Sequence, residues 1–118
     1  MPAQSSRQAL SPARVRVARA SQLGERAASL LSDIRVVMCD PVRTQIVRAL
    51  AVQPLTVSDL VATTGRGRTS VSQHLRVLRQ ESLVESNRRG RMIYYVLTNG
   101  LAASSTVTLL GVVAELAL

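Results

Sequence analysis

The sequence predicts a small, mainly helical domain that contains one β-hairpin, and three observations support this. The chain has 118 residues, the length of a single domain. It contains neither Phe nor Trp, so its core must be aliphatic, which favours helices and short strands over a large sheet. Apolar residues recur every three or four positions before Leu83, and shorter strand-like runs follow it.

The N-terminal end has the composition of a disordered tail. Residues 1–12 are rich in Ser, Gln and Ala and include Pro2 and Pro12. The predicted domain covers residues 13–118. Its first stretch carries Arg14, Arg16 and Arg19 without an acidic residue. We interpret this stretch either as a solvated segment or as a basic arm that reaches a polyanion.

A first helix is predicted from about Leu23 to about Met38. Its apolar stripe consists of Leu23, Ala27, Leu30, Ile34 and Val37, widened by Leu31 and Met38. The helix should end near Cys39, because Pro41 disfavours helical geometry in the residue before it.

Capping residues predict the next two helices. Asp40 is a good N-cap and Pro41 suits the first helical position, so a second helix should run to about Ala51. Gln53–Pro54 ends it. Thr56, followed by Asp59 three residues later, resembles a capping box and predicts the start of a third helix.

A glycine turn, a fourth helix, a hairpin and a last helix follow. Gly65 and Gly67 enclose the turn, and Val71, Leu75 and Leu78 give the fourth helix an inward face. The runs 84–87 and 92–97 are predicted strands on either side of the loop 88–91, Arg-Arg-Gly-Arg. The run 101–118 is apolar on most sides and is predicted to be a helix buried on two sides, not a membrane span.

The charge of the chain calls for a polyanionic partner. All fifteen basic residues are Arg, against seven acidic ones, and the net charge is +8. Such a chain is attracted to nucleic acid or to an anionic membrane face. The single cysteine, Cys39, excludes an internal disulfide and fits a reducing cytoplasm, and no signal peptide is visible.

The third and fourth helices form a helix-turn-helix pattern. A helix fits the DNA major groove, where short polar side chains and Arg reach base edges and phosphates. The hairpin would carry arginines to the adjacent minor groove or backbone. The predicted DNA-binding residues are Arg66, Arg68, Thr69, Ser70, Ser72, Gln73, His74, Arg76, Arg88, Arg89 and Arg91. For His74, a DNA contact and a structural hydrogen bond both remain open.

Four blocks of sequence resemble the ArsR/SmtB family of bacterial regulators. They are Asp-Pro-Val-Arg at 40–43, Ile-Val-Arg-Ala-Leu at 46–50, Ser-Val-Ser-Gln-His-Leu-Arg-Val-Leu at 70–78, and Leu83–Val84 with the hairpin. The resemblance implies a winged helix-turn-helix fold in the order helix, helix, helix, helix, hairpin, helix. It implies a transcriptional regulator, usually a repressor, whose homodimer binds an imperfect palindrome in double-stranded DNA.

The resemblance also implies dimerisation through the first and last helices. Both carry more apolar surface than one small core requires. The predicted interface residues are Leu23, Ala27, Leu30, Leu31, Ile34, Val107, Leu110, Val113, Ala114 and Ala117.

The metal sites of this family do not carry over. Thr56 and Ser58 stand where thiolate-type members have a Cys-x-Cys pair, and the last helix offers Glu115 but no histidine. No cofactor is evident, and a metal or other effector stays undetermined. Ser82 occupies the position of a helix-ending glycine, which predicts a left-handed residue under strain.

Other functions find less support in the residues. His74 is the only histidine and no phosphate-binding loop occurs, so we expect no enzyme. A winged helix that binds a protein partner, with weak or no specific DNA binding, is the alternative, and attachment to a membrane surface is a third. For Cys39 we expect a small buried residue at a helix end, with a redox role or an intersubunit disulfide as the alternatives.

Overall fold

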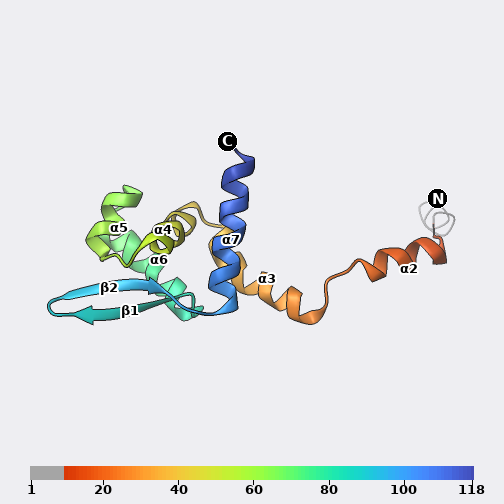
Figure 1. Cartoon of the computed structure of the whole chain (residues 1–118), viewed down its shortest axis with the longest axis horizontal. Coiled ribbons are helices and arrows are strands. Elements are labelled where there is room, and N and C mark those ends of the chain that lie inside the picture. The colour runs from red at the N-terminus through yellow and green to blue at the C-terminus, as the bar shows by residue number, and fades with distance from the viewer. Residues whose placement is uncertain (1–9) are drawn as a thin grey trace.

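The predicted order of helices and hairpin is confirmed, with one helix added at the N-terminal end. The computed structural model describes residues 10–118 (Figure 1). The expected tail therefore lies outside the described residues, apart from positions 10–12. The elements are α2 (Pro12–Ala20), α3 (Glu25–Met38), α4 (Pro41–Val52), α5 (Val57–Thr64), α6 (Arg68–Gln80), β1 (Val84–Arg89), β2 (Met92–Leu97) and α7 (Leu101–Leu116).

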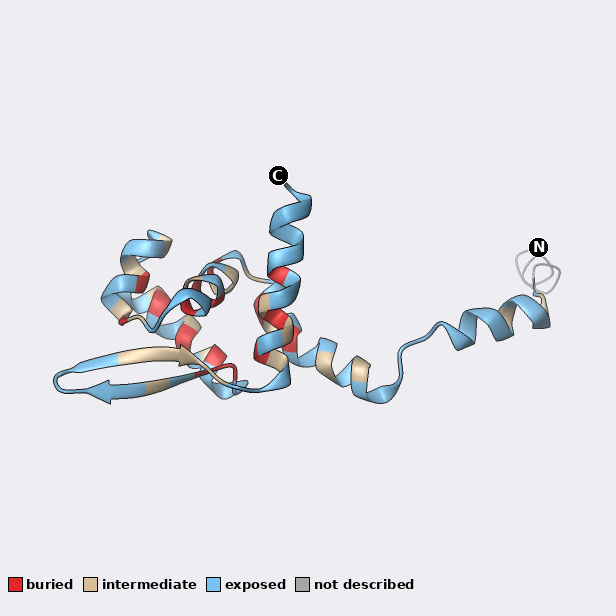
Figure 2. Ribbon diagram, viewed as in Figure 1, coloured by how far each residue is buried: buried red, intermediate tan, exposed pale blue. Residues whose placement is uncertain are grey.

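The added helix, α2, stands apart from the rest of the domain (Figure 1). Ser11 caps it by accepting a hydrogen bond from the Arg14 N–H, and Pro12 occupies its first turn. None of its residues is buried (Figure 2). Its helical form was not expected from the sequence, because its apolar residues form no sustained inward stripe.

The first expected helix, α3, is shorter than its apolar stripe suggests. Gly24 is its N-cap, so Leu23 precedes the helix and is exposed. Only Ile34 and Val37 are buried along its length. Cys39 is the C-cap and is exposed, so the expectation of a buried cysteine is wrong. Val37 is the last buried residue of α3, and Cys39, two positions later, lies outside the core.

Asp40 starts α4 by capping it. Its carboxylate accepts hydrogen bonds from the backbone N–H groups of Val42 at 2.8 Å and Arg43 at 3.1 Å. Burial raises the pKa of this carboxyl, but the two hydrogen bonds and the electrostatic influence of His74 and Arg43 outweigh it. The pKa of Asp40 is therefore lowered. The ionised carboxylate stabilises the junction between α3 and α4.

We expect Asp40→Ala to lower the free energy of unfolding by about 0.5–2 kcal/mol, since α4 loses its cap. Asp40→Asn, the matched control, keeps an accepting oxygen and loses only the charge. Because the native pKa is depressed, the contribution of the charge is present above about pH 4 and is lost as the pH falls through the native value. Urea unfolding of wild type and Asp40→Asn from about pH 7 to about pH 3 measures the difference in their free energies of unfolding. This difference should become smaller as the pH falls. A difference in the free energy of unfolding that does not change with pH would contradict this role of the Asp40 charge.

The capping box and the glycine turn form as predicted. Thr56 accepts a hydrogen bond from the Asp59 N–H, and the Asp59 carboxylate accepts one from the Thr56 N–H. Gly65 ends α5 with φ 71°, in the left-handed region that favours glycine. Ser82 follows α6 with φ 59°, so the predicted left-handed serine is also found.

The hairpin is a two-stranded antiparallel ribbon that projects from the helices (Figure 1). Val84 pairs with Leu97 at its base and Arg89 with Met92 at its tip. Arg88 and Arg89 belong to β1, so the connecting loop is Gly90–Arg91 and is shorter than the expected loop 88–91. Gly90, with φ 62°, allows this tight turn.

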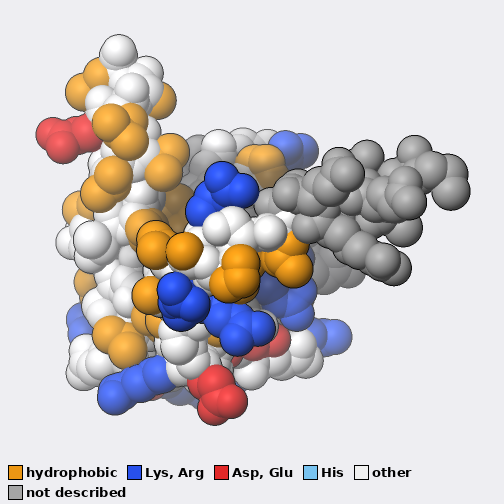
Figure 3. Space-filling view, turned by 90° about the vertical axis from the view of Figure 1, so that its right-hand side faces the viewer, with side chains coloured by type: hydrophobic (Ala, Val, Ile, Leu, Met, Phe, Trp, Pro, Cys, Tyr) orange, Lys and Arg blue, Asp and Glu red, His pale blue; other side chains and the backbone are white. Residues whose placement is uncertain are grey.

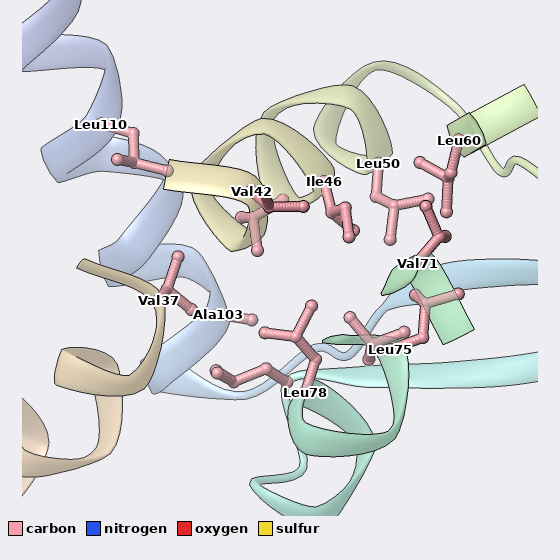
Figure 4. Close-up of a cluster of buried hydrophobic side chains, with 13 residues drawn as sticks. Val37, Val42, Ile46, Leu50, Leu60, Val71, Leu75, Leu78, Ala103 and Leu110 are labelled. Atoms are coloured by element: carbon pink, nitrogen blue, oxygen red, sulfur yellow. The ribbon is translucent and has the colours of Figure 1, made fainter. Parts of the chain in front are cut away.

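One aliphatic core holds α4, α5, α6 and the base of the hairpin together (Figure 4). Val71, Leu75 and Leu78 of α6 point toward α4, where Ile46 and Leu50 lie. Helix α7 closes the core with Ala103, Thr106 and Leu110, which lie within its first ten residues. Among the described residues, no helix combines the length and hydropathy that a membrane crossing requires.

Candidate nucleic-acid interface

Helix α6 presents a polar face to solvent on the side opposite its buried residues. Arg68, Thr69, Ser72, Gln73 and Arg76 are exposed and together line a shallow hollow of about 330 Å³. Their spacing places them on one side of the helix. Val71, Leu75 and Leu78 hold the other side in the core. The polar face is therefore held by a rigid support.

Two predicted contact residues of α6 turn toward the body instead. Ser70 and His74 are half-buried. The Nδ1 atom of His74 accepts a hydrogen bond of 3.1 Å from Nε of Arg43 on α4. Of the two interpretations of His74, the structural hydrogen bond is the one formed in this structure.

The N-terminal end of α6 favours an anion. Its first turn contains no acidic residue, and Gly67, its N-cap, gives no side-chain hydrogen bond, so the first N–H groups of α6 have no capping side chain. Arg66 and Arg68 are exposed beside this end. The guanidinium of Arg68 donates to Oγ of Ser58 on α5 at 2.6 Å, which places its charge near the junction of the two helices. A phosphate group fits this environment.

The three arginines of the hairpin differ in how they are held. Nε of Arg88 donates to the Gly90 carbonyl at 3.2 Å. The Arg89 guanidinium lies over the ring of Tyr94, 5.5 Å from its centroid. Arg91 is exposed in the turn itself. The hairpin thus carries three positive charges close to its tip.

A second exposed surface is apolar and runs over α3 and α7. The two helices pack together and enclose a groove of about 340 Å³. Figure 3 shows hydrophobic side chains along the upright column of α7. The groove is lined by Leu30, Leu31, Ile34, Ser104, Ser105, Thr108 and Leu109.

The structure divides the predicted interface residues of these two helices. Ile34 and Leu110 are buried in the chain's own core, with 2% and 8% of their surface exposed. Five of the predicted residues are exposed: Leu23, Leu31, Val113, Ala114 and Ala117. The other three are half-buried: Ala27, Leu30 and Val107.

The exposed stripe of α7 consists mainly of residues that sequence reasoning missed. Its members are Leu109, Val112, Val113 and Leu116, with 40%, 50%, 59% and 83% of their surface exposed. Only Val113 was in the predicted set. Their spacing of three, one and three residues places them on one helix face, but α7 is apolar on most sides, so the spacing alone does not show that this face is exposed.

The positions that hold thiolate ligands in some ArsR/SmtB members are occupied by other contacts here. Thr56 is part of the capping box, and Ser58 accepts the hydrogen bond from Arg68. Within residues 10–118, no group of three or more His, Cys, Asp or Glu side chains lies together so that it could hold a metal ion.

Comparison with known proteins places this fold and this surface in a family. Residues 40–86, which span α4, the helix-turn-helix and the start of the hairpin, match the family described as bacterial regulatory protein, arsR family. The biofilm growth-associated repressor of Xylella fastidiosa is 33% identical over 79 residues, which cover 67% of this chain and 69% of the repressor. The chain belongs to the arsR family. Its relatives in this comparison are transcriptional regulators and repressors.

Two further comparisons agree with membership of the arsR family. The crystal structure of the transcriptional repressor BigR from Xylella fastidiosa superposes with a TM-score of 0.70 at 30% identity, covering 77% of this chain and 89% of BigR. The transcriptional repressor SmtB homolog of Synechocystis is 38% identical over 72 residues, 61% of this chain. The match spans about half of that relative, 54% of its length. This chain therefore shares its fold with a solved transcriptional repressor of similar sequence.

Proposed function

We propose that this arsR-family chain is a sequence-specific DNA-binding transcriptional repressor that works as a homodimer in the cytoplasm. The observation that carries the proposal is the exposed polar face of α6, set opposite three residues buried in the core. The repressor function of the relatives from Synechocystis and Xylella fastidiosa supports the same conclusion.

In this proposal α6 lies in the major groove. Its exposed side chains contact base edges and phosphates, because short polar groups and the planar arginine fork can bond to both. These side chains are Thr69, Ser72, Gln73 and Arg76. Arg66 and Arg68 hold a phosphate at the N-terminal end of the helix. Ser70 and His74 lie at the margin of this contact, since they are half-buried.

The hairpin acts as a wing on the adjacent minor groove or backbone. Arg88, Arg89 and Arg91 supply charge there, and charge neutralisation of phosphates gives affinity that does not depend on sequence. The cation–π contact with Tyr94 limits the conformations of Arg89, so less entropy is lost on binding.

A second copy of the chain would cover the apolar groove between α3 and α7. The last residues of α7, from Gly111 onward, are all exposed although most are apolar, and such a surface is typical of an interface. Two-fold symmetry would present two α6 helices to half-sites about 34–36 Å apart on an imperfect palindrome.

The wing and the recognition helix should respond differently to substitution. Replacing Arg89 and Arg91 by Ala is expected to weaken binding to every duplex. The salt dependence of the affinity should become shallower by about one unit of slope for each phosphate that the variant no longer neutralises. Fluorescence anisotropy at several salt concentrations measures both quantities. The probes are a duplex selected from a random library by the wild-type protein and an unrelated duplex of equal length.

The matched variant is Gln73→Ala, which removes no charge. It should lower the preference for the selected duplex by about 1–3 kcal/mol and leave binding to the unrelated duplex nearly unchanged. The opposite result, in which the wing changes preference and Gln73 changes only affinity, would reverse the assignment. A wild-type protein that selects no duplex would instead support the alternative function, a winged helix that binds a protein partner.

A further inference from the structure

One side chain joins three helices behind the proposed DNA-binding face. Arg43 lies in the first turn of α4 and is half-buried. Its Nε donates to Nδ1 of His74 on α6 at 3.1 Å, and its terminal amino group donates to the carbonyl of Val36 on α3 at 2.8 Å. The guanidinium therefore bridges the end of α3 and the middle of α6.

The acceptor on α3 belongs to the last turn of that helix. The backbone N–H groups of Cys39 and Asp40 bond to the carbonyls of Arg35 and Val37. The Val36 carbonyl, which lies between them, takes the guanidinium, with the weakly donating Cys39 thiol at 3.9 Å. Carbonyls at a helix C-terminus carry partial negative charge and lack helical partners, so they are suitable acceptors for a cation.

The hydrogen bond from Arg43 constrains the acceptor on α6, which is His74. Arg has only donor groups and keeps its charge, so the Nδ1 atom of His74 must carry a lone pair to accept this bond. Nδ1 is therefore the accepting atom of this bond, and Arg43 is its donor. His74 is the only histidine of the chain, and its neighbours Gln73 and Leu75 belong to the polar face and to the core.

We propose that Arg43 is a positioning residue that fixes α6 relative to α3 through its hydrogen bonds to His74 and Val36. The inference rests on the proposed function, in which α3 carries the dimer contact and α6 reads DNA. Apolar packing of Val71, Leu75 and Leu78 holds α6 on the core, but apolar contacts are not directional. A planar, charged fork with two acceptors is directional, and it sets the direction in which the polar face points.

This role has a consequence for recognition of two half-sites. In a dimer, the position of α6 relative to α3 determines the distance between the two recognition helices, which must match the half-site spacing. Loss of the bridge should lower affinity for a palindromic site, where both helices must fit together. It should change binding to unrelated DNA little, because contacts to phosphates tolerate a small change of angle.

The test compares charge-preserving and acceptor-preserving variants. Arg43→Lys keeps the positive charge, but a single ammonium cannot replace the fork across both acceptors. His74→Ala removes the acceptor, whereas His74→Asn keeps an oxygen close to the place of Nδ1. Arg26→Lys, at an exposed position of α3, is the matched control for the arginine change. Far-UV circular dichroism and thermal unfolding check that each variant folds.

The DNA measurement uses the selected duplex and the unrelated duplex described above. We expect Arg43→Lys and His74→Ala each to lower affinity for the selected duplex about tenfold, with about a twofold change or less on the unrelated duplex. His74→Asn should restore most of the affinity that His74→Ala removes. The double variant Arg43→Lys with His74→Ala should bind little more weakly than either single variant, because both remove the same bond.

A spectroscopic measurement tests the bridge without DNA. The Nε–H signal of Arg43 in a ¹H–¹⁵N spectrum is identified by its disappearance in Arg43→Lys. It should shift in His74→Ala and return toward its wild-type position in His74→Asn. The inference would be overturned, and the proposed function would stand, if the Nε–H signal kept its wild-type position in both His74 variants. The same holds if Arg43→Lys bound the selected duplex with wild-type affinity. A wild-type protein that does not prefer its selected duplex would overturn the proposed function and the inference with it.

Discussion

Leu31→Glu is expected to convert the proposed dimer to a monomer and to lower affinity for the selected duplex by a factor of about 100 to 10,000. Leu31 lines the groove between α3 and α7, and 47% of its surface is exposed in the single chain. A second copy on this groove would bury the new carboxylate without a partner, which is costly. Without the dimer, each half-site must be bound independently and the advantage of linked binding disappears.

Val113→Glu should have the same effect from α7, because Val113 belongs to the exposed stripe of that helix. Ser29→Glu is the matched control. Ser29 is exposed on α3, and helical spacing places it on the side away from Leu31 and Ile34. It adds the same negative charge outside the proposed interface.

Sedimentation velocity measures the state of association, and fluorescence anisotropy measures the affinity on the same preparations. A monomeric Leu31→Glu beside a dimeric Ser29→Glu would support the interface. If Leu31→Glu stays dimeric and binds as wild type does, the second copy occupies another surface and the proposed interface is wrong.

Leu75→Ala is expected to lower the free energy of unfolding by about 2–5 kcal/mol. Leu75 has 1% of its surface exposed and lies among the core residues of α6, facing α4 (Figure 4). The substitution removes apolar contacts and leaves a cavity that a close-packed core fills only in part. Domains of this size have about 5–15 kcal/mol of stability in total, so the decrease would be a large fraction of it.

Urea unfolding followed by circular dichroism at a fixed protomer concentration measures this change, since the stability of a dimer depends on concentration. Ser72→Ala, on the exposed face of the same helix, should change stability by no more than about 0.5 kcal/mol. A cost below about 1 kcal/mol for Leu75→Ala would show that α6 is not held by this core.

The boundaries of most elements could be predicted because their signals are local. Asp40 caps α4, Thr56 and Asp59 form the capping box of α5, and Gly65 ends α5 with a positive φ, as their residue types indicate. Each of these interactions joins residues within about four positions of one another. The helix α2 was missed since it lacks the inward stripe on which the prediction of α3 depended.

The sequence by itself determined the helix-turn-helix, its hairpin and the polar face of α6, because caps, turns and apolar periodicity act over a few neighbouring residues. Only the tertiary structure decided which apolar residues of α3 and α7 face inward. It buries Ile34 and Leu110 and leaves Leu109, Val112 and Leu116 outside. It alone also joins His74 to Arg43, a residue 31 positions away. Such contacts depend on how separate helices meet, and no local pattern in either helix encodes them.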